Sequence, residues 1–254
     1  MTIQSEEDLQ GLRRVGQVVA KALQLMQAAL KPGITTAELD EIGRQVLAAN
    51  GAQSAPIYYY AYPATTCISI NEEAAHAIPG PRVVQSGDLV NIDVSAVLDG
   101  YVADTGASFP VGEVTPVARQ LCRAAQEALH AALVVAKAGN RMEEVTKAIE
   151  KVARQHRFSI IENLAGHGVG RHIHEAPEFV PDYGRKKDRR RFQKGMVITL
   201  EPFLSTGGET AEEQKDGWTL ALKPGQLSAQ YEHTIVITER EPILITAGAH
   251  SVNL

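Results

Sequence analysis

Four acidic residues of this 254-residue chain are embedded in apolar, strand-forming stretches. Asp93 and Asp104 lie in the first part of the chain, and Glu201 and Glu232 lie in the second. Because burying an unpaired charge is costly, each acid needs a partner. Any one of them alone could be a salt-bridged or edge carboxylate. Four together repel one another unless a cation compensates, so the group predicts a site for divalent metal.

The first two acids are expected to converge. Asp99-Gly100 is a two-residue hairpin signal between two strand-forming stretches. A tight hairpin at this point pairs Ser95 with Asp104. It also makes Asp93 a diagonal neighbour of Asp104 on the same face, roughly 7–8 Å away at the backbone. The two carboxylates could then hold one cation or a close pair of cations.

Histidines near glycine supply further candidate ligands. His167 lies between two glycines, whose backbone freedom permits a tight approach to a ligand. His174 and His76 lie in loops where they could face a substrate. Carboxylates with one imidazole suit Mn, Fe(II), Co or Zn, and two such ions could hold a shared hydroxide nucleophile. Three further histidines are interpreted as solvated surface residues: His130, His156 and His250.

Two pairs of helices are expected to support these strands. Ser5 and Thr35 are N-cap candidates for the first pair, and Thr115-Pro116 starts a third helix whose inner face is expected to include Val117. Asn140 with Glu143 is expected to cap the fourth helix.

The two helix pairs are alike, which predicts a duplicated plan. The related halves would span about 1–110 and 111–254 within a single domain, 1–254. The alternative is that amphipathic helices resemble one another in any case. Strands follow each pair, so the fold class is expected to be α+β, with helices packed on a largely antiparallel curved sheet.

Composition excludes several classes of protein. The chain has 44% hydrophobic and 22% charged residues and a net charge of -5, which excludes a disordered chain and a global grip on DNA. Its apolar runs are too short to span a membrane, and its acidic start is unlike a signal peptide, so a cytoplasmic location is expected. Cys67 and Cys122 are expected to be reduced. The basic run Arg185–Arg191 is either a solvated loop or a contact with ribosomal RNA.

Short motifs along nearly the whole chain resemble those of type I methionine aminopeptidases in their short bacterial form. They occur in the family's order and spacing, and the set is specific although no single motif is. The motifs are Cys67-Ile68-Ser69-Ile70-Asn71, His76-x-Ile78-Pro79, Asn91-Ile92-Asp93-Val94, Asp104-Thr105, Gly166-His167-Gly168-Val169-Gly170-Arg171, His174-Glu175-x-Pro177, Leu200-Glu201-Pro202, Lys215-Asp216-Gly217-Trp218 and Ser228-Ala229-Gln230-Tyr231-Glu232-His233-Thr234.

The resemblance implies the pita-bread fold, with two halves related by a pseudo-twofold axis, and a centre of two divalent metal ions. In that family pattern Asp104 and Glu232 bridge the ions, His167 and Glu201 hold one of them, and Asp93 holds the other. The ions are Co, Mn, Fe(II) or Zn, and an additional monovalent cation is possible. The implied reaction is hydrolysis, by water that the ions activate, of the bond after an N-terminal methionine when the second residue is small.

The resemblance also implies roles for further residues. His76 would contact the substrate amide nitrogen or the departing amine, His174 would polarise the scissile carbonyl, and Glu201 would shuttle a proton. The methionine pocket would be lined by Tyr59, Tyr62, Cys67, Ile173 and Trp218. The alternative for the tyrosine cluster is a strand packed on the core.

The chain departs from the family pattern at four positions outside the ligand set. Ala77 stands where glycine is usual, Ile173 replaces a frequent aromatic, Pro56 replaces a cysteine and His172 replaces a glycine. The expected substrates are methionyl peptides and nascent chains, and the expected state is a monomer. Two other functions stay open: a pita-bread binding protein that has lost catalysis, and a peptidase of the proline-peptidase kind.

Overall fold

Two helices near the N-terminus form the first layer of the fold. The computed structural model describes residues 1–181, 183 and 188–250. Helix α1 (Glu6–Ala29) packs on α2 (Thr36–Ala49). The Ser5 hydroxyl caps α1 by accepting the Asp8 N–H, and α2 begins with a reciprocal capping box between Thr35 and Glu38. The start expected for each helix is therefore confirmed.

A second helix pair begins with α4 (Pro116–Val135), which Thr115 caps as expected. Its buried face starts at Ala118, whereas Val117 is 48% exposed, so the inner face predicted from Val117 is wrong at its first position. One residue rotates a helix by about 100°, which is enough to move a side chain from the core to solvent.

Helix α5 (Met142–His156) starts one residue later than expected. Arg141 is the N-cap, and the Glu144 carboxylate accepts the Arg141 N–H at 3.2 Å. The predicted cap of Asn140 with Glu143 is therefore wrong. The Asn140 side chain instead donates to the carbonyl of Val135 at the end of α4, at 2.9 Å.

A long hairpin forms the centre of the molecule. Strands β4 (Leu89–Leu98) and β5 (Tyr101–Pro110) pair along their whole lengths, with Ser95 opposite Asp104 as expected. The turn residues Asp99 and Gly100 both have positive φ, 52° and 75°, which is typical of a type I′ hairpin. Strands β1 (Gln53–Ser54) and β2 (Cys67–Ile70) complete this sheet by pairing with β4.

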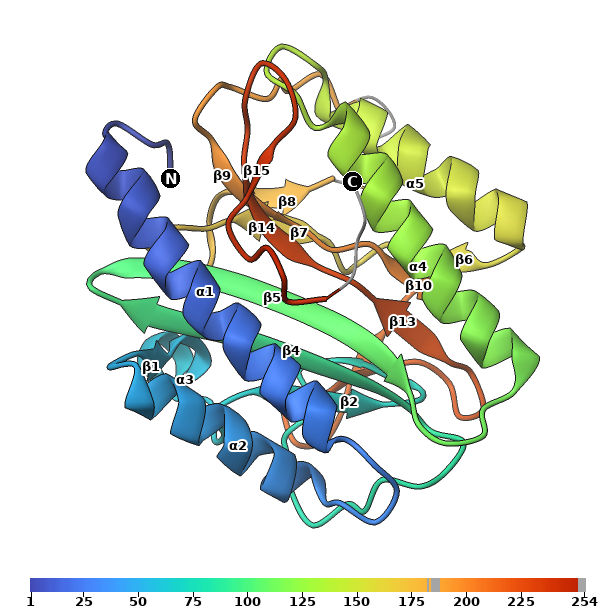
Figure 1. The fold of residues 1–254 in the computed structure, drawn as a ribbon. Helices are drawn as coiled ribbons and strands as arrows, with labels where there is room; N and C mark the ends of the chain where they lie inside the picture. Colours follow the sequence, from blue (N-terminus) through green and yellow to red (C-terminus); the bar gives the residue numbers. More distant parts are fainter. Residues whose placement is uncertain (182, 184–187, 251–254) are drawn as a thin grey trace.

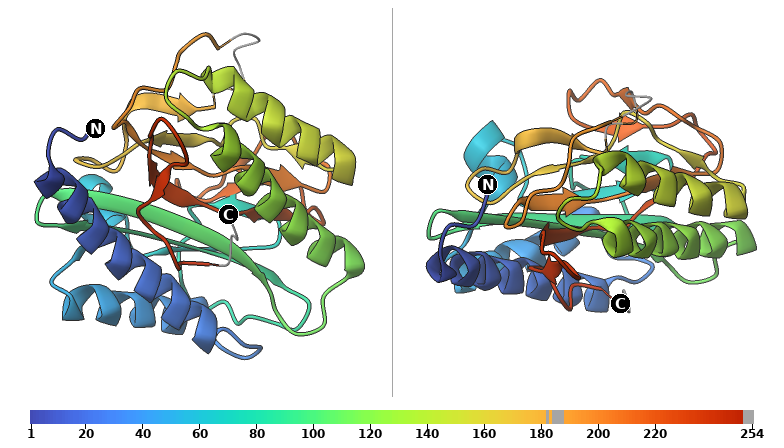
Figure 2. Two further views of the ribbon diagram at one scale, coloured as in Figure 1. Left: turned by 45° about the horizontal axis from the view of Figure 1, so that its top comes forward. Right: turned by 90° about the horizontal axis from the view of Figure 1, so that it is seen from above.

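Helix α1 covers one face of this hairpin, which Figure 2 shows in its right-hand view. In Figure 1, α1 crosses in front of β4 and β5, α2 lies at the lower left, and α4 and α5 lie on the right. Buried apolar side chains of α1, including Leu12, Leu23 and Met26, join those of the hairpin in one core. No helix in the described part of the chain is long and apolar enough to cross a membrane.

Short strands build three further sheets, and all of these strands except β3 come from the second part of the chain. The five-stranded sheet has the order β15-β14-β9-β7-β8, formed by β7 (Gly166–Gly168), β8 (Glu175–Val180), β9 (Val197–Leu200), β14 (His233–Val236) and β15 (Ile243–Leu244). One three-stranded sheet contains β6 (Ser159–Ile160), β10 (Phe203–Ser205) and β13 (Ser228–Gln230). The other contains β3 (Glu73–Ala75), β11 (Glu212–Glu213) and β12 (Leu220–Ala221).

Strand β5 connects the central hairpin to the later sheets. The Asp104 N–H donates to Thr234 Oγ1 at 2.9 Å, and the Glu232 N–H donates to the carbonyl of Gly106 at 2.9 Å. An isolated bridge between Ala107 and Tyr231 continues this pairing. These hydrogen bonds bring the acids of both parts of the chain to one place.

The tyrosine-rich segment folds as a short helix, α3 (Ala55–Tyr60), rather than as a strand. The Ser54 hydroxyl caps its first turn, Pro56 occupies a position that proline favours, and Ala61 ends it with φ of 54°. The alternative of a strand packed on the core is therefore wrong.

Candidate metal centre

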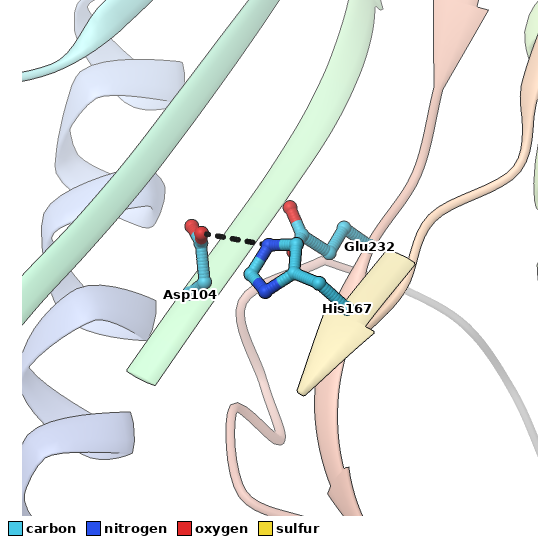
Figure 3. A group of neighbouring side chains, drawn as sticks. All are labelled: Asp104, His167 and Glu232. Carbon is cyan, nitrogen blue, oxygen red and sulfur yellow. Dashed lines mark ion pairs between the residues drawn. The ribbon is translucent and has the colours of Figure 1, made fainter. Parts of the chain in front are cut away.

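Three side chains from three different elements meet in the interior. Asp104 on β5, His167 on β7 and Glu232 between β13 and β14 place ligand atoms within 4.8 Å of one another. All three are buried, with at most 6% of each residue exposed. Figure 3 shows the His167 ring directed towards Asp104, with Glu232 beside it. The described residues thus contain one compact group of acids and imidazole that could hold a metal ion.

The His167 ring is held in the tautomer that a metal ligand needs. Its Nδ1–H donates to the carbonyl of Gly168 at 3.0 Å, because a carbonyl can only accept. Nε2 therefore carries a lone pair, and it lies 3.5 Å from Glu201 Oε1 and 3.9 Å from Asp104 Oδ2. Burial lowers the pKa of His167 to about 3, with smaller contributions from His174 and His76, so the ring is a neutral donor.

Glu201 and Glu232 lie where strand pairing passes from one sheet to the next. Leu200 pairs with His233 in the five-stranded sheet, and the next ladder begins with Phe203 opposite Gln230. Pro202 has no N–H to donate, so the ladder is interrupted here. Both acids fall in this gap, which frees their side chains to enter the centre.

Side-chain hydrogen bonds hold the two glutamates. The Thr199 hydroxyl accepts the His167 backbone N–H at 2.9 Å and donates to Glu201 Oε1 at 2.9 Å. Gln230 Nε2 donates to Glu232 Oε2 at 3.0 Å. Hydrogen bonds of this kind orient metal ligands. Each also opposes the rise in the pKa of its glutamate, because a donor stabilises the charged carboxylate.

The Gln230 amide is itself fixed in orientation by the central hairpin. Asn91 Nδ2 donates to Gln230 Oε1 at 2.8 Å, which leaves the amide NH2 to face Glu232. Gly106 provides the space, because a Cβ at that position would lie 2.5 Å from Gln230 Oε1. Asn91, Gly106 and Gln230 were not singled out as site residues in the sequence, although a buried amide beside acids is a usable signal.

Asp93 completes the acidic group from β4. It lies opposite Gly106 on β5 and opposite Cys67 on β2. Burial raises its pKa far above the usual range, and the negative charges of Asp104 and Glu201 add to that effect. Asp93 and Asp104 are diagonal neighbours on one face, as the hairpin register predicts.

The pKa values of the other three acids are raised as well. Burial raises the pKa of Asp104 to about 6 and raises the pKa values of Glu201 and Glu232, with Asp104 as the next contributor to both glutamates. Asp104 Oδ1 and Glu232 Oε1 are buried and find no hydrogen-bond partner among the described residues. Acids that repel one another, two orphaned carboxylate oxygens and one imidazole lone pair match the donor set of a divalent transition-metal site.

A cavity of about 670 Å³ opens beside this centre. It is lined by most of the residues expected in the site, although Glu232 and Tyr59 are not in its wall. The expected residues that line it are Tyr62, Cys67, His76, Asp93, Asp104, His167, Ile173, His174, Glu201 and Trp218, and further lining residues include Pro56, Tyr60, Phe203 and Leu220.

Tyr60 takes the place in the cavity wall that was expected for Tyr59. The Tyr59 hydroxyl donates to the carbonyl of Arg171 at 2.8 Å, and its ring packs against His172 at 5.3 Å. A helix directs neighbouring side chains about 100° apart, so the helical form of this segment decides which tyrosine faces inwards. The helix signals at Ser54 and Pro56 could have indicated this.

The apolar end of the cavity is formed by aromatic side chains. The Tyr62 and Trp218 rings meet edge to face at 5.1 Å, and the Tyr62 hydroxyl donates to the carbonyl of Ala77 at 2.9 Å. His76 itself adopts φ of 57°, whereas Ala77 is not among the described residues with positive φ. Alanine at position 77 is therefore compatible with the backbone.

Two histidines project from the walls towards the centre. Neighbouring residues desolvate the His76 ring and lower its pKa to about 4, with a contribution from the nearby His174, although the residue keeps exposed surface. Desolvation also lowers the pKa of His174, which likewise keeps exposed surface and whose ring centre lies 4.2 Å from that of His167. Both rings are therefore neutral near pH 7, so each has one N–H donor and one acceptor.

His250 is half-buried and packed in the interior by its contacts, so its interpretation as a solvated surface residue is wrong. Its Nε2–H donates to the carbonyl of Glu232 at 2.7 Å, and its ring stacks on His233 at 4.2 Å. This contact depends on the path of the last residues of the chain, for which local sequence carries no signal. His156 lies near the surface, where it contacts Glu127 at 2.7 Å.

The basic run falls partly outside the described residues, which omit Arg185, Lys186 and Lys187. Within its described part, Arg190 contacts Asp188 and donates to the carbonyl of Phe179 at 2.9 Å. Arg191 donates to the carbonyl of Gly139. The contact with RNA stays a prediction.

The buried acidic centre with its neutral imidazole, open to a cavity, defines an enzyme of the metal-dependent hydrolase class. Residues 10–239 match the model of metallopeptidase family M24. The chain belongs to this family. The α+β expectation and the pita-bread fold are thereby confirmed.

Similar proteins extend over almost the whole chain. A protein named methionine aminopeptidase from Staphylococcus epidermidis is 44% identical over 247 residues, which is 97% of this chain and 98% of the relative. A protein named methionine aminopeptidase 2 from Bacillus subtilis has the same identity and covers 97% of this chain and 99% of the relative. The crystal structure of a methionine aminopeptidase from Thermotoga maritima has a TM-score of 0.92 at 32% identity, with 97% and 99% of the two chains covered.

Proposed function

We propose that this protein removes the N-terminal methionine from peptides and nascent proteins by metal-dependent hydrolysis. The single observation that carries the proposal is the convergence of Asp104, His167 and Glu232 beside a cavity with an apolar end. Membership in family M24 and full-length similarity to methionine aminopeptidases support the same activity.

The proposed ligand set consists of five residues. Asp104 and Glu232 would bridge two divalent ions, His167 and Glu201 would hold one ion, and Asp93 would hold the other. The orphaned oxygens of Asp104 and Glu232 support their role as ligands, because a buried carboxylate oxygen needs a hydrogen-bond donor or a cation. The identity of the ions is expected to be Mn, Fe(II), Co or Zn, which suit this mixture of ligands.

The residues of the cavity suggest how the reaction proceeds. When bound, the divalent ions would lower the pKa of a water molecule and so provide the nucleophile at neutral pH. Glu201, held by Thr199, would take the proton of that water and pass it on. His174 would donate a hydrogen bond to the carbonyl oxygen as negative charge develops there. His76 would contact the nitrogen of the scissile bond.

The apolar end of the cavity supports a preference for methionine. Tyr62, Cys67, Ile173 and Trp218 offer an apolar and polarisable wall, which suits a flexible thioether side chain. A small second residue is expected. We further infer a single catalytic unit over 1–254 with related halves of about 1–110 and 111–254, a monomeric state, and a cytoplasmic location where nascent chains are available.

Hydrolysis of the peptide Met-Ala-Ser tests the proposal directly. The purified protein is assayed before metal removal, after exhaustive removal confirmed by elemental analysis, and after restoration of each divalent ion. Release of free methionine is expected only with metal, and X-Pro peptides serve as the control substrate. Cleavage that persists in verified metal-free protein would contradict the mechanism. Cleavage of X-Pro but not Met-Ala-Ser would favour the proline-peptidase alternative, and no cleavage in any metal form would favour a binding protein.

A further inference from the structure

Tyr60 makes a direct hydrogen bond to a histidine in the cavity wall. Its Oη lies 2.7 Å from His174 Nδ1, and the two ring centres are 5.6 Å apart. Tyr60 is the last residue of α3, and the left-handed conformation of Ala61 ends the helix directly after it. Both Tyr60 and His174 line the cavity beside the candidate metal centre.

The chemistry of the two groups sets the direction of this hydrogen bond. A phenol is a better donor than acceptor, because its oxygen lone pair is delocalised into the ring. A neutral imidazole nitrogen is a strong acceptor. Near pH 7 a phenol keeps its proton and an imidazole is mostly neutral, because their ordinary pKa values are about 10 and about 6.5. Tyr60 therefore donates to His174 Nδ1.

A neutral imidazole that accepts at Nδ1 must carry its proton at Nε2. Nδ1 is occupied by Tyr60, so Nε2 is the nitrogen that remains available to the cavity. In this tautomer the ring presents an N–H donor there. The other tautomer would present a lone pair, which repels a carbonyl oxygen that is gaining negative charge.

We propose that Tyr60 is a positioning residue that fixes His174 as the Nε2–H tautomer and so aims a hydrogen-bond donor at the substrate carbonyl. The proposal rests on the proposed function for the identity of the substrate, although the tautomer itself can be measured without any substrate. Tyr60 acts only through His174, whereas the proposed roles of the other pocket aromatics are direct contacts with substrate.

Tyr58 supplies a matched control on the same helix. It is the same residue type, it is 60% exposed, and its hydroxyl makes no hydrogen bond within the described residues. Its ring contacts the Tyr59 ring at 4.9 Å, so loss of the hydroxyl leaves that packing in place. Comparing Tyr60→Phe with Tyr58→Phe therefore isolates the hydrogen bond to His174.

The kinetic experiment measures kcat and KM on Met-Ala-Ser for wild type and both variants, with thermal unfolding to confirm the fold. Tyr60→Phe is expected to lower kcat by about 10- to 100-fold with KM within about twofold, as for partners that orient a reacting group. Tyr58→Phe is expected to leave both constants unchanged. An unchanged kcat in Tyr60→Phe, or an equal loss in both variants, would overturn the proposal.

A spectroscopic experiment keeps the proposal testable even if the enzyme assay fails. Nitrogen-15 NMR of the zinc-loaded protein distinguishes protonated from unprotonated ring nitrogens, and His174→Gln identifies the signals of His174. The wild type is expected to show the Nε2–H tautomer, and Tyr60→Phe a mixture of the two tautomers. A wild-type spectrum with the proton at Nδ1 would overturn the proposal. Absence of methionine release with the expected spectrum would instead count against the proposed function alone.

Discussion

The two parts of the chain bring acids to the same centre by different means. Asp93 and Asp104 lie within β4 and β5, whose ladder is continuous from Leu89 opposite Pro110 to Leu98 opposite Tyr101. Glu201 and Glu232 lie in the gap between two short ladders. The backbone therefore fixes the aspartates, whereas neighbouring side chains must fix the glutamates.

This difference indicates which acids are most sensitive to substitution of the residues around them. In the hairpin, both aspartates lie within the continuous ladder of β4 and β5, and the Asp104 backbone also bonds to the Thr234 hydroxyl. In the later sheets, Glu201 depends on Thr199 and Glu232 depends on Gln230. Changes to supporting side chains should therefore damage the second pair of acids more than the first.

The largest expected effect follows from removing Asp104, which is proposed to bridge the two ions and so to join the ligands of both parts of the chain. Asp104→Ala is expected to lower kcat/KM for Met-Ala-Ser by more than about a thousandfold, because a bridging ligand of the proposed centre is lost. Bound metal, measured by elemental analysis after dialysis, should fall below that of the wild type. The fold should persist, since the variant removes one of four repelling acids. Wild-type metal content and activity in this variant would show that Asp104 is not a metal ligand.

A change in a supporting residue tests the contrast between the two pairs. Thr199→Val keeps the side-chain shape, but it removes the acceptor for His167 N–H and the donor to Glu201. Metal affinity, measured by competition with a chelator, is expected to fall by about 10- to 100-fold. The control is Ser95→Ala, opposite Asp104 on the hairpin, where Ser95 makes no side-chain hydrogen bond within the described residues. Equal losses of metal affinity in both variants would contradict the difference between the glutamates and the aspartates.

The pH dependence of the metal-free protein tests the repulsion among the acids. Burial raises the pKa of Glu232 in the folded state, so the folded protein binds a proton there more readily than the unfolded chain does. The free energy of unfolding contributed by this group therefore falls as pH rises above the ordinary glutamate pKa of 4.5. Relative to Glu232→Gln, the metal-free wild type is therefore expected to lose stability as the pH rises above 4.5.

Urea denaturation of both proteins in chelator, at several pH values, measures this difference, and the difference cancels the histidine contributions that the two proteins share. Addition of a divalent ion at pH 7 should reverse the order, because binding to the folded state stabilises the wild type more. A difference that is independent of pH would show that Glu232 does not carry an unfavourable charge in the metal-free protein.

The smallest expected effect concerns the helix starts of the two halves. The Thr35 side chain takes part in a capping box, whereas Arg141 makes no side-chain cap. Thr35→Ala is expected to lower the free energy of unfolding by about 1 kcal/mol, and Arg141→Ala by less than about 0.5 kcal/mol. Urea denaturation of the metal-loaded protein measures both values. A larger loss for Arg141→Ala would contradict the assignment of the cap.

Local signals predicted the first half better than the second. The Asp99-Gly100 turn determines the register of β4 and β5, because a two-residue loop allows only one pairing. The N-cap of α5 was predicted one residue too early. Glu143 and Glu144 are adjacent, so Asn140 with Glu143 and Arg141 with Glu144 both have the spacing of a capping box. The candidate acids could be found because a carboxylate in an apolar strand is costly wherever it lies.

Other features depend on contacts between distant segments. Tyr60 faces the cavity because its segment is helical, and its partner His174 is 114 residues away in the chain. Gln230 is oriented by Asn91 across 139 residues. His250 is half-buried only because the last residues return to Glu232. Periodicity and capping signals extend over a few residues, so they cannot report such contacts.

The position of the glutamates at a junction between sheets also has a consequence for biosynthesis. A ribosome releases the hairpin with Asp93 and Asp104 long before the later strands exist, since Asp104 and Thr234 are 130 residues apart. The first half alone offers two carboxylates and no imidazole from this centre, which is a poor trap for transition metals. The proposed ligand set is complete only once Glu232 has been synthesised, so selective binding of a transition metal is expected only near the end of translation.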